Sequence, residues 1–222
     1  MRELYHLWLS PACRQVRIML AEKQLEFELI IEKEWERRES FLKLNPAGEV
    51  PVLLEADGTV LPGSTVICEY LDEAYPEPSL LGDTALARAE TRRLIMWFST
   101  KFNVEVTENL LSEKFDKRFL GRGSPNTHAI RAGKTNIGYH LEYIGYLCER
   151  RRWLSGDNIS LADITAAAHL SALDYLGDVP WDDHPGARDW YARIKSRPSL
   201  RPILADHIPG LPPPKSYANL DF

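Results

Sequence analysis

The sequence predicts an α/β domain followed by an all-helical domain, and two features of the 222-residue chain support this. Strand-like and helical patterns alternate over the first 75 residues. Beyond a proline-containing break at residues 76–82, strand signals vanish and apolar residues recur at helical spacing. We therefore expect an α/β domain over residues 1–75, a linker over 76–86, a helical domain over 87–207 and a proline-rich tail over 208–222.

The α/β domain is expected to combine a β-α-β unit with a β-hairpin. Its strand segments are short apolar runs, and its helical segments place apolar residues three or four positions apart. Strands joined by a helix pair in parallel, whereas the turn at residues 56–58 favours an antiparallel hairpin. The predicted strands are residues 4–9, 26–31, 52–54 and 59–61, and the predicted helices are residues 12–23 and 64–75.

One helix start in the second half has a strong local signal. Ser160 can accept a hydrogen bond from a free amide of the first turn, and Asp163 can accept one from the Ser160 amide. The Ala-rich segment that follows predicts a buried helix that its neighbours approach closely. The aromatic residues Trp97, Phe98 and Trp190 match helical spacing, which predicts core positions.

The composition argues against several classes of function. The chain has 27 Lys and Arg against 32 Asp and Glu, so its net charge of -5 offers no general attraction to nucleic acid or anionic lipid. No apolar run approaches the roughly 20 residues of a membrane span, and the start lacks the features of a signal peptide. Neither the three cysteines nor the histidines show metal-ligand spacing. We expect a cytoplasmic protein with no metal, no membrane insertion and no nucleic-acid partner.

The segment Ser10-Pro11-Ala12-Cys13 lies between the first predicted strand and helix and has two interpretations. Ser10 can cap the helix, with Pro11 at the first helical position, where a missing amide costs nothing. Alternatively, the Ser10 hydroxyl or the Cys13 thiol can act at the helix N-terminus, where the helix dipole favours a negative charge. On these residues alone, capping is the favoured interpretation.

The segment NPAGEVPV at residues 45–52 places Pro51 at the start of a predicted strand. One interpretation is a tight turn followed by an edge strand. The other is a cis Val50-Pro51 bond that turns the backbone amide and carbonyl of Val50 toward a cleft for an extended peptide ligand. Spacing leaves the isomer open.

The order of these motifs resembles the glutathione S-transferase family. The segments SPAC at 10–13, NPAGEVPVL at 45–53 and LPGSTVICEYL at 61–71 are similar to the thioredoxin-like half of that family. The Ser-x-x-Asp capping box is similar to the helical half. The resemblance implies a thioredoxin-like domain, an α-helical domain, a homodimer and a glutathione cleft.

The resemblance also implies roles for individual residues. Ser10 falls where many members stabilise the thiolate of glutathione, and Ser64 falls on the residue that holds its γ-glutamyl carboxylate. Val50 and Pro51 fall on the cis-proline site. Gly63 departs from the family, because most members have an acid there to pair with the amine of the ligand. Loss of a hydrogen bond to a charged group weakens binding about ten- to a hundredfold, so no cofactor is expected and glutathione should bind weakly.

A narrower resemblance covers the chain from end to end. The runs WERR at 35–38, GYLCERRRW at 145–153 and PPPKSYANLDF at 212–222 are similar to a cell-division group of this family in alphaproteobacteria, whose members bind filaments of the tubulin-like protein FtsZ. This resemblance implies a non-catalytic FtsZ-binding module at the division site. The rival interpretation is a glutathione transferase that acts on a small electrophile, with Ser10 or, less favoured, Cys13 stabilising the thiolate of glutathione. A third interpretation is a scaffold for another partner.

The candidates for partner contact are Trp35, Tyr217, Leu220, Asp221 and Phe222. Trp35 lies in a charged stretch, where a lone Trp is a core plug or an exposed anchor. The prolines of the tail favour an extended backbone, and its end offers apolar area beside two negative charges, which suits a groove with a basic rim. The alternative is that these apolar residues fold back onto their own domain. We expect deletion of residues 212–222 to leave folding nearly intact.

Overall fold

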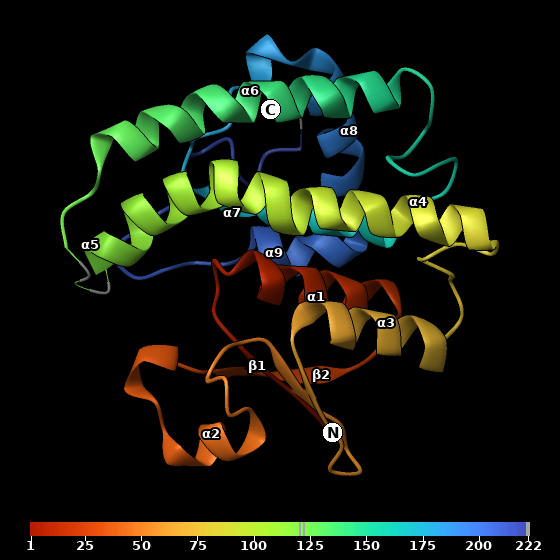
Figure 1. Ribbon diagram of the computed structural model, residues 1–222, viewed down its shortest axis with the longest axis vertical. Helices are drawn as coiled ribbons and strands as arrows, with labels where there is room; N and C mark the ends of the chain where they lie inside the picture. Colours follow the sequence, from red (N-terminus) through yellow and green to blue (C-terminus); the bar gives the residue numbers. More distant parts are fainter. Residues whose placement is uncertain (120, 122, 221–222) are drawn as a thin grey trace.

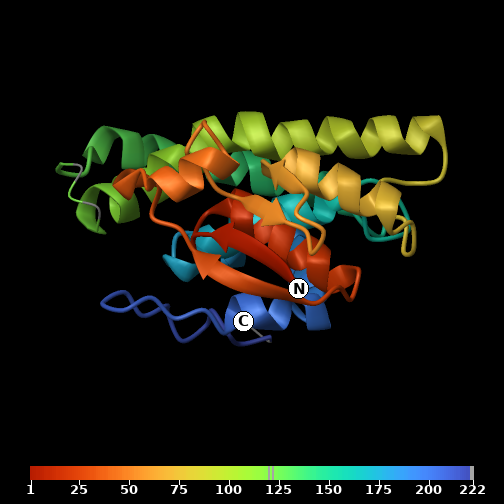
Figure 2. The same cartoon turned by 90° about the horizontal axis from the view of Figure 1, so that it is seen from below.

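The computed structural model describes the whole chain except residues 120, 122, 221 and 222. As predicted, the N-terminal domain is a small sheet with helices, and the C-terminal domain is helical (Figure 1). The two domains share an apolar core, in which α1 (Pro11–Glu22) packs against α7 (Leu161–Tyr175). Figure 2 shows the C-terminal segment, in blue, on the opposite side of the molecule from α4 (Ala85–Met96).

Four strands form the sheet in the order β2-β1-β3-β4. They are β1 (Arg2–His6), β2 (Phe27–Ile31), β3 (Val52–Leu54) and β4 (Val60–Pro62). Leu4 of β1 pairs with Leu29 of the parallel strand β2 and with Leu53 of the antiparallel strand β3. The β-α-β unit and the hairpin are therefore both confirmed. The first strand ends at His6 rather than at residue 9, because the chain turns there to reach Ser10 at the start of α1.

The helices of this domain include two that the sequence did not reveal. The predicted ones are α1 and α3 (Ser64–Ala74). The others are the 3₁₀ turn η1 (Glu34–Glu36) and α2 (Glu39–Leu44), which is fastened by the buried side chain of Phe41. Both are too short for a helical period to appear in the sequence.

The proline-containing linker is fastened to the N-terminal domain. The ammonium of Lys23 donates hydrogen bonds to the carbonyl oxygens of Tyr75, at 2.7 Å, and Pro78, at 2.6 Å. It also lies 2.7 Å from Asp72 Oδ1, and the Asp72 carboxylate accepts hydrogen bonds from the amides of residues 80 and 81. Because the Lys23 ammonium and the Asp72 carboxylate both have hydrogen-bond partners, these charges can be buried. Their contacts hold the linker in a defined position before the helical domain starts.

The helical domain starts with one long helical rod. α4 continues into η2 (Trp97–Asp116), whose turns are wider, since the Lys117 amide donates to the Ser112 carbonyl five residues back. α6 (Thr127–Cys148) lies alongside this rod (Figure 1). The other helical elements are α5 (Lys117–Phe119), η3 (Trp181–Asp183), α8 (Pro185–Lys195), η4 (Pro198–Leu200) and α9 (Arg201–Leu204). Among the described residues, no helix has the length and apolar character needed to span a membrane.

The helix α7 is buried along its whole length, and its predicted capping box forms. Asp163 Oδ2 accepts hydrogen bonds from the amide of Ser160, at 3.0 Å, and from its hydroxyl, at 2.8 Å. Asp163 Oδ1 accepts a third from Trp190 Nε1 at 2.9 Å. Trp190 and Phe98 are fully buried as predicted, whereas Trp97 is only partly buried. The acid therefore ties the start of α7 to α8.

Candidate ligand and partner site

A cleft of about 370 Å³ lies between the two domains. One wall comes from the chain that joins β1 to α1 and from the end of β2 with η1, and the opposite wall comes from η2. The lining is largely apolar, with a few polar groups at its edge. The residues that matter most here are Ser10, Ile31, Glu34, Trp35, Phe115 and Ile208.

Ser10 lines this cleft and also caps α1. Its hydroxyl accepts a hydrogen bond from the amide of Cys13 at 3.4 Å, as the capping interpretation expects, and Pro11 occupies the first helical position. Cys13 is fully buried, and this burial raises the pKa of its thiol to about 12. Cys13 therefore remains a thiol at neutral pH, and of these two side chains only Ser10 reaches the cleft.

The Val50-Pro51 peptide bond is cis, the isomer that the functional interpretation requires. The backbone amide of Val50 is already engaged, because it donates a hydrogen bond to Glu34 Oε1 at 2.6 Å. Sequence reasoning did not single out Glu34. It is one of several acids in a charged stretch, and no local pattern marks which of them reaches residue 50.

Gly63 and Ser64 follow β4 and lie beside the cis-proline bond. The Gly63 amide donates a hydrogen bond to the Pro51 carbonyl at 2.9 Å, so the structure brings these two motifs together. Gly63 has a φ of +87°, a conformation that favours glycine, yet no atom lies within 4 Å of the position that a Cβ would take. There is room for a side chain here, but this chain supplies no carboxylate at position 63. Ser64, the first residue of α3, is half-buried.

Trp35 is an exposed side chain at the rim of the cleft. It is 42% exposed and lies on η1, and the 51% exposed Ile31 of β2 lines the same cleft. Of the two interpretations of a lone Trp in a charged stretch, the structure favours the exposed anchor over the core plug. The two side chains form an apolar rim that the domain itself leaves uncovered.

Tyr217 is fully buried and is not an exposed contact of the tail. Its hydroxyl accepts a hydrogen bond from Arg14 Nη1 at 3.2 Å and donates one to the Ile203 carbonyl at 3.0 Å. Its ring packs edge-on against Tyr175 at 5.1 Å. The expectation that residues 212–222 can be removed without harm to folding is therefore wrong, since that deletion takes away a core side chain.

The last residues of the chain differ from Tyr217. Leu220 is 47% exposed and remains accessible for a partner. Asp221 and Phe222, the other two predicted contacts of the tail, lie outside the described residues.

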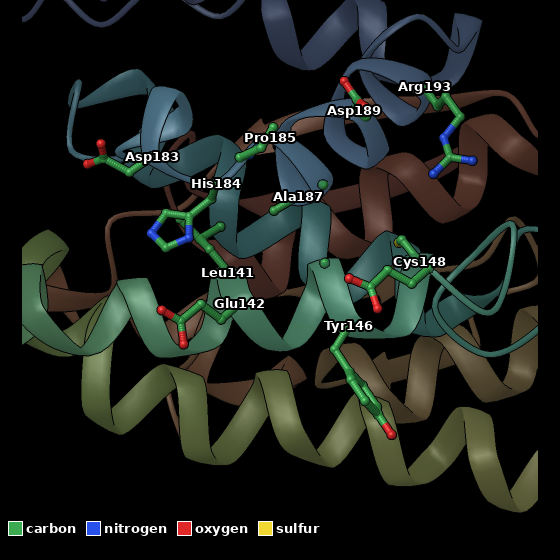
Figure 3. Close-up of a pocket in the computed structure, with 13 residues that line it drawn as sticks. Leu141, Glu142, Tyr146, Cys148, Asp183, His184, Pro185, Ala187, Asp189 and Arg193 are labelled. Carbon is green, nitrogen blue, oxygen red and sulfur yellow. The ribbon is translucent and has the colours of Figure 1, made fainter.

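A second groove, of about 400 Å³, lies between α6 and the η3–α8 segment (Figure 3). Exposed carboxylates, among them Glu142 and Asp189, line it together with His184. Cys148 also lines it, but burial raises the pKa of this thiol to about 11, so it is not a ready nucleophile. Of the sequence motifs, only the run at residues 145–153 borders this groove, through Gly145, Tyr146, Cys148 and Glu149.

Comparison with known proteins places these motifs in a family. Residues 4–79 match the family model of the glutathione S-transferase N-terminal domain, and residues 127–193 match that of the C-terminal domain. The chain is 48% identical over 224 residues to FtsZ-localized protein A of Caulobacter vibrioides, covering 100% of this chain and 98% of that protein.

Two solved structures are similar over the full chain. A glutathione S-transferase from Rhodospirillum rubrum F11 has a TM-score of 0.98 and 59% identity, covering 100% of both chains. FzlA from C. crescentus has a TM-score of 0.96 and 48% identity, covering 100% of this chain and 99% of that one.

Proposed function

The chain belongs to the glutathione S-transferase family, and we propose that it serves as a non-catalytic module that binds filaments of FtsZ during cell division. The observation that carries this proposal is the full-length similarity to FtsZ-localized protein A. At 48% identity with no missing domain, the same surface can be presented by both proteins. The module acts in the cytoplasm, at the division site.

The geometry of the cleft supports a binding role over catalysis. The Val50 amide, which a glutathione backbone would use, is engaged by Glu34. Position 63 has no carboxylate for the amine of the ligand, and Cys13 is a buried thiol of raised pKa. Each of these features weakens either ligand binding or thiolate chemistry, and no resident cofactor is needed.

The FtsZ-binding surface is centred on Trp35. An exposed Trp with an apolar neighbour, here Ile31, is typical of the anchors that dominate protein interfaces. The end of the tail, with Leu220, Asp221 and Phe222, supplies a second and separate contact to the division machinery.

A homodimer completes the proposed assembly. Apolar side chains are exposed on three neighbouring helices: Val66 on α3, Met96 on α4, and Tyr139 and Tyr146 on α6. These helices are linked within the chain, since Arg92 of α4 pairs with α3 and Arg93 of α4 bonds to α6. Exposed apolar area of this kind is the usual sign of an interface, and a second copy of the chain is the proposed occupant.

The alternative function is a glutathione transferase that acts on a small electrophile. Ser10 lines the cleft, the Val50-Pro51 bond is cis, and a 59% identical solved structure carries the name glutathione S-transferase. Turnover of a standard electrophile that is abolished by Ser10→Ala would favour this alternative.

Co-sedimentation with polymerised FtsZ tests the proposed function. The wild-type protein should pellet with filaments, and Trp35→Ala should weaken binding about tenfold or more. Leu86→Ala is the control, because Leu86 is an exposed apolar residue on α4, away from the cleft lining. Wild-type protein that stays in the supernatant would overturn the proposal, and equal losses for both variants would remove Trp35 from the contact.

A further inference from the structure

The hydrogen bond between Glu34 and Val50 couples two parts of the site. Glu34 Oε1 lies 2.6 Å from the Val50 amide nitrogen, which is a short N–H···O hydrogen bond. The Gly63 amide donates to the Pro51 carbonyl, which extends the β3–β4 pairing by one residue. The Val50 amide, which would bind the backbone of an extended peptide, is therefore occupied by a side chain of the protein itself.

The segment that carries Glu34 also carries Trp35. Glu34 and Trp35 are adjacent in the three-residue turn η1, so the Glu34 hydrogen bond to Val50 helps to fix the backbone that presents the exposed Trp35 ring. After η1, Arg37 has a φ of +45°, and its Nη1 lies 3.3 Å from the position that a Cβ on Gly48 would take. Both ends of η1 thus rest on the loop at residues 45–50, and the Glu34 bond is the one that reaches the ligand edge.

We propose that Glu34 is an internal ligand that excludes extended peptides from the Val50 amide and at the same time holds Trp35 in place at the cleft rim. A thiol tripeptide such as glutathione, whose backbone carbonyl would accept from the Val50 amide, binds only when Glu34 withdraws. Withdrawal removes a contact that anchors η1, so peptide binding and the presentation of Trp35 oppose each other. The second half of this statement rests on the proposed function of Trp35, whereas the first half does not.

Thermodynamic linkage makes the coupling reciprocal. If glutathione lowers the affinity for FtsZ by some factor, FtsZ must lower the affinity for glutathione by the same factor. The cleft is then a remnant of a ligand site that regulates the partner surface through a single carboxylate. The coupling through Glu34 is independent of the missing acid at position 63, because that absence weakens glutathione binding in either state of Glu34.

Calorimetric titration with glutathione tests the first half of the proposal. Glu34→Ala frees the Val50 amide, so it should bind glutathione at least about tenfold more tightly than wild type. Glu34→Gln keeps an oxygen acceptor without its charge and should fall between the two. Glu36→Ala is the matched control, because Glu36 lies on the same turn and its carboxylate pairs with the exposed Lys33 at 2.9 Å. The glutathione affinity of this variant should equal that of wild type.

Filament pelleting tests the second half. Glu34→Ala should bind FtsZ more weakly although Trp35 is intact, and glutathione should not weaken this binding further, because the carboxylate that couples the two sites is gone. In wild type, a saturating concentration of glutathione should weaken pelleting with FtsZ. A thermal melt of each variant checks that it is folded. If Glu34→Ala does not fold, the titration and the pelleting are carried out with Glu34→Gln instead.

The two halves fail separately. Glu34→Ala and Glu34→Gln that bind glutathione no better than wild type would overturn the internal-ligand proposal, whatever FtsZ does. Improved glutathione binding without any effect on pelleting would overturn the coupling to Trp35. If wild type itself does not pellet, the proposed function fails, while the titrations still decide the role of Glu34.

Discussion

The hydroxyl of Tyr217 accepts a hydrogen bond from the guanidinium of Arg14, although 203 residues separate the two in the chain. Arg14 is fully buried, and it shares the carboxylate of Asp206 with Arg17. One carboxylate thus serves two cations. A buried charge requires hydrogen-bond partners, so the Tyr217 hydroxyl belongs to the set of acceptors that makes this cluster tolerable. The tail is therefore part of the core as far as Tyr217.

Tyr217→Ala should lower the free energy of unfolding by about 3–5 kcal/mol, because it opens a cavity and removes an acceptor from Arg14. Leu220→Ala, at a position that is 47% exposed, should change it by less than about 0.5 kcal/mol. Urea unfolding of the two variants measures both effects. Similar small changes in the free energy of unfolding for both variants would show that Tyr217 does not stabilise the core.

Removal of residues 218–222 should separate stability from function. This truncation keeps Tyr217 and its contacts, so the melting temperature should stay close to that of the full chain. If the end of the tail contacts a division protein, cell division should fail in a strain that carries only the truncated form. Asp221→Lys should act in the same direction by reversing one charge. Normal division with either change would assign the tail a purely structural role.

Gly63→Glu should strengthen glutathione binding about tenfold relative to Gly63→Ala. Both substitutions impose the same strain, since position 63 has a φ of +87°, and both fit into open space. Only Glu supplies a carboxylate for the amine of the ligand. Comparing the two variants by titration calorimetry separates the effect of the carboxylate from the effect of backbone strain. Equal affinities would show that the missing acid does not account for weak glutathione binding.

Stability should fall in mild acid because of buried histidines. Burial lowers the pKa of His169 to about 3, and burial lowers that of His6 to about 4. In the unfolded chain these histidines take up protons below about pH 6.5. Above that pH they are neutral in both states and do not lower the free energy of unfolding. Below it, each histidine removes about 1.4 kcal/mol per pH unit until its folded pKa is reached.

Urea midpoints between about pH 5 and 7 measure this slope. His169→Gln should reduce this slope of unfolding free energy against pH by the contribution of one proton. Identical slopes for wild type and His169→Gln would contradict the assignment.

Light scattering should give about twice the 25.4 kDa of one chain at micromolar concentration. Tyr139→Asp, which places a charge among the exposed apolar side chains of α3, α4 and α6, should shift the mass toward one chain. Glu28→Lys on β2, the edge strand farthest from β4, changes a charge elsewhere and should leave the mass unchanged. A wild-type mass of one chain would refute the dimer.

Elements whose signals are local could be predicted from the amino-acid sequence. The capping of α1 by Ser10, the capping box of α7 and the hairpin after Pro51 all depend on residues within a few positions of one another, so each was predictable to within a few residues. The family, and with it the fold, followed from the order of these local motifs.

Which side chains remain accessible could be seen only in the folded chain. Tyr217 and Trp35 were equivalent candidates by composition, yet one is fully buried and the other is 42% exposed. The Glu34 contact with Val50 spans 16 residues and depends on how η1 meets the loop before Pro51. Burial and such contacts arise from segments that meet only after folding, and because no periodicity or turn signal encodes that meeting, they became visible only in three dimensions.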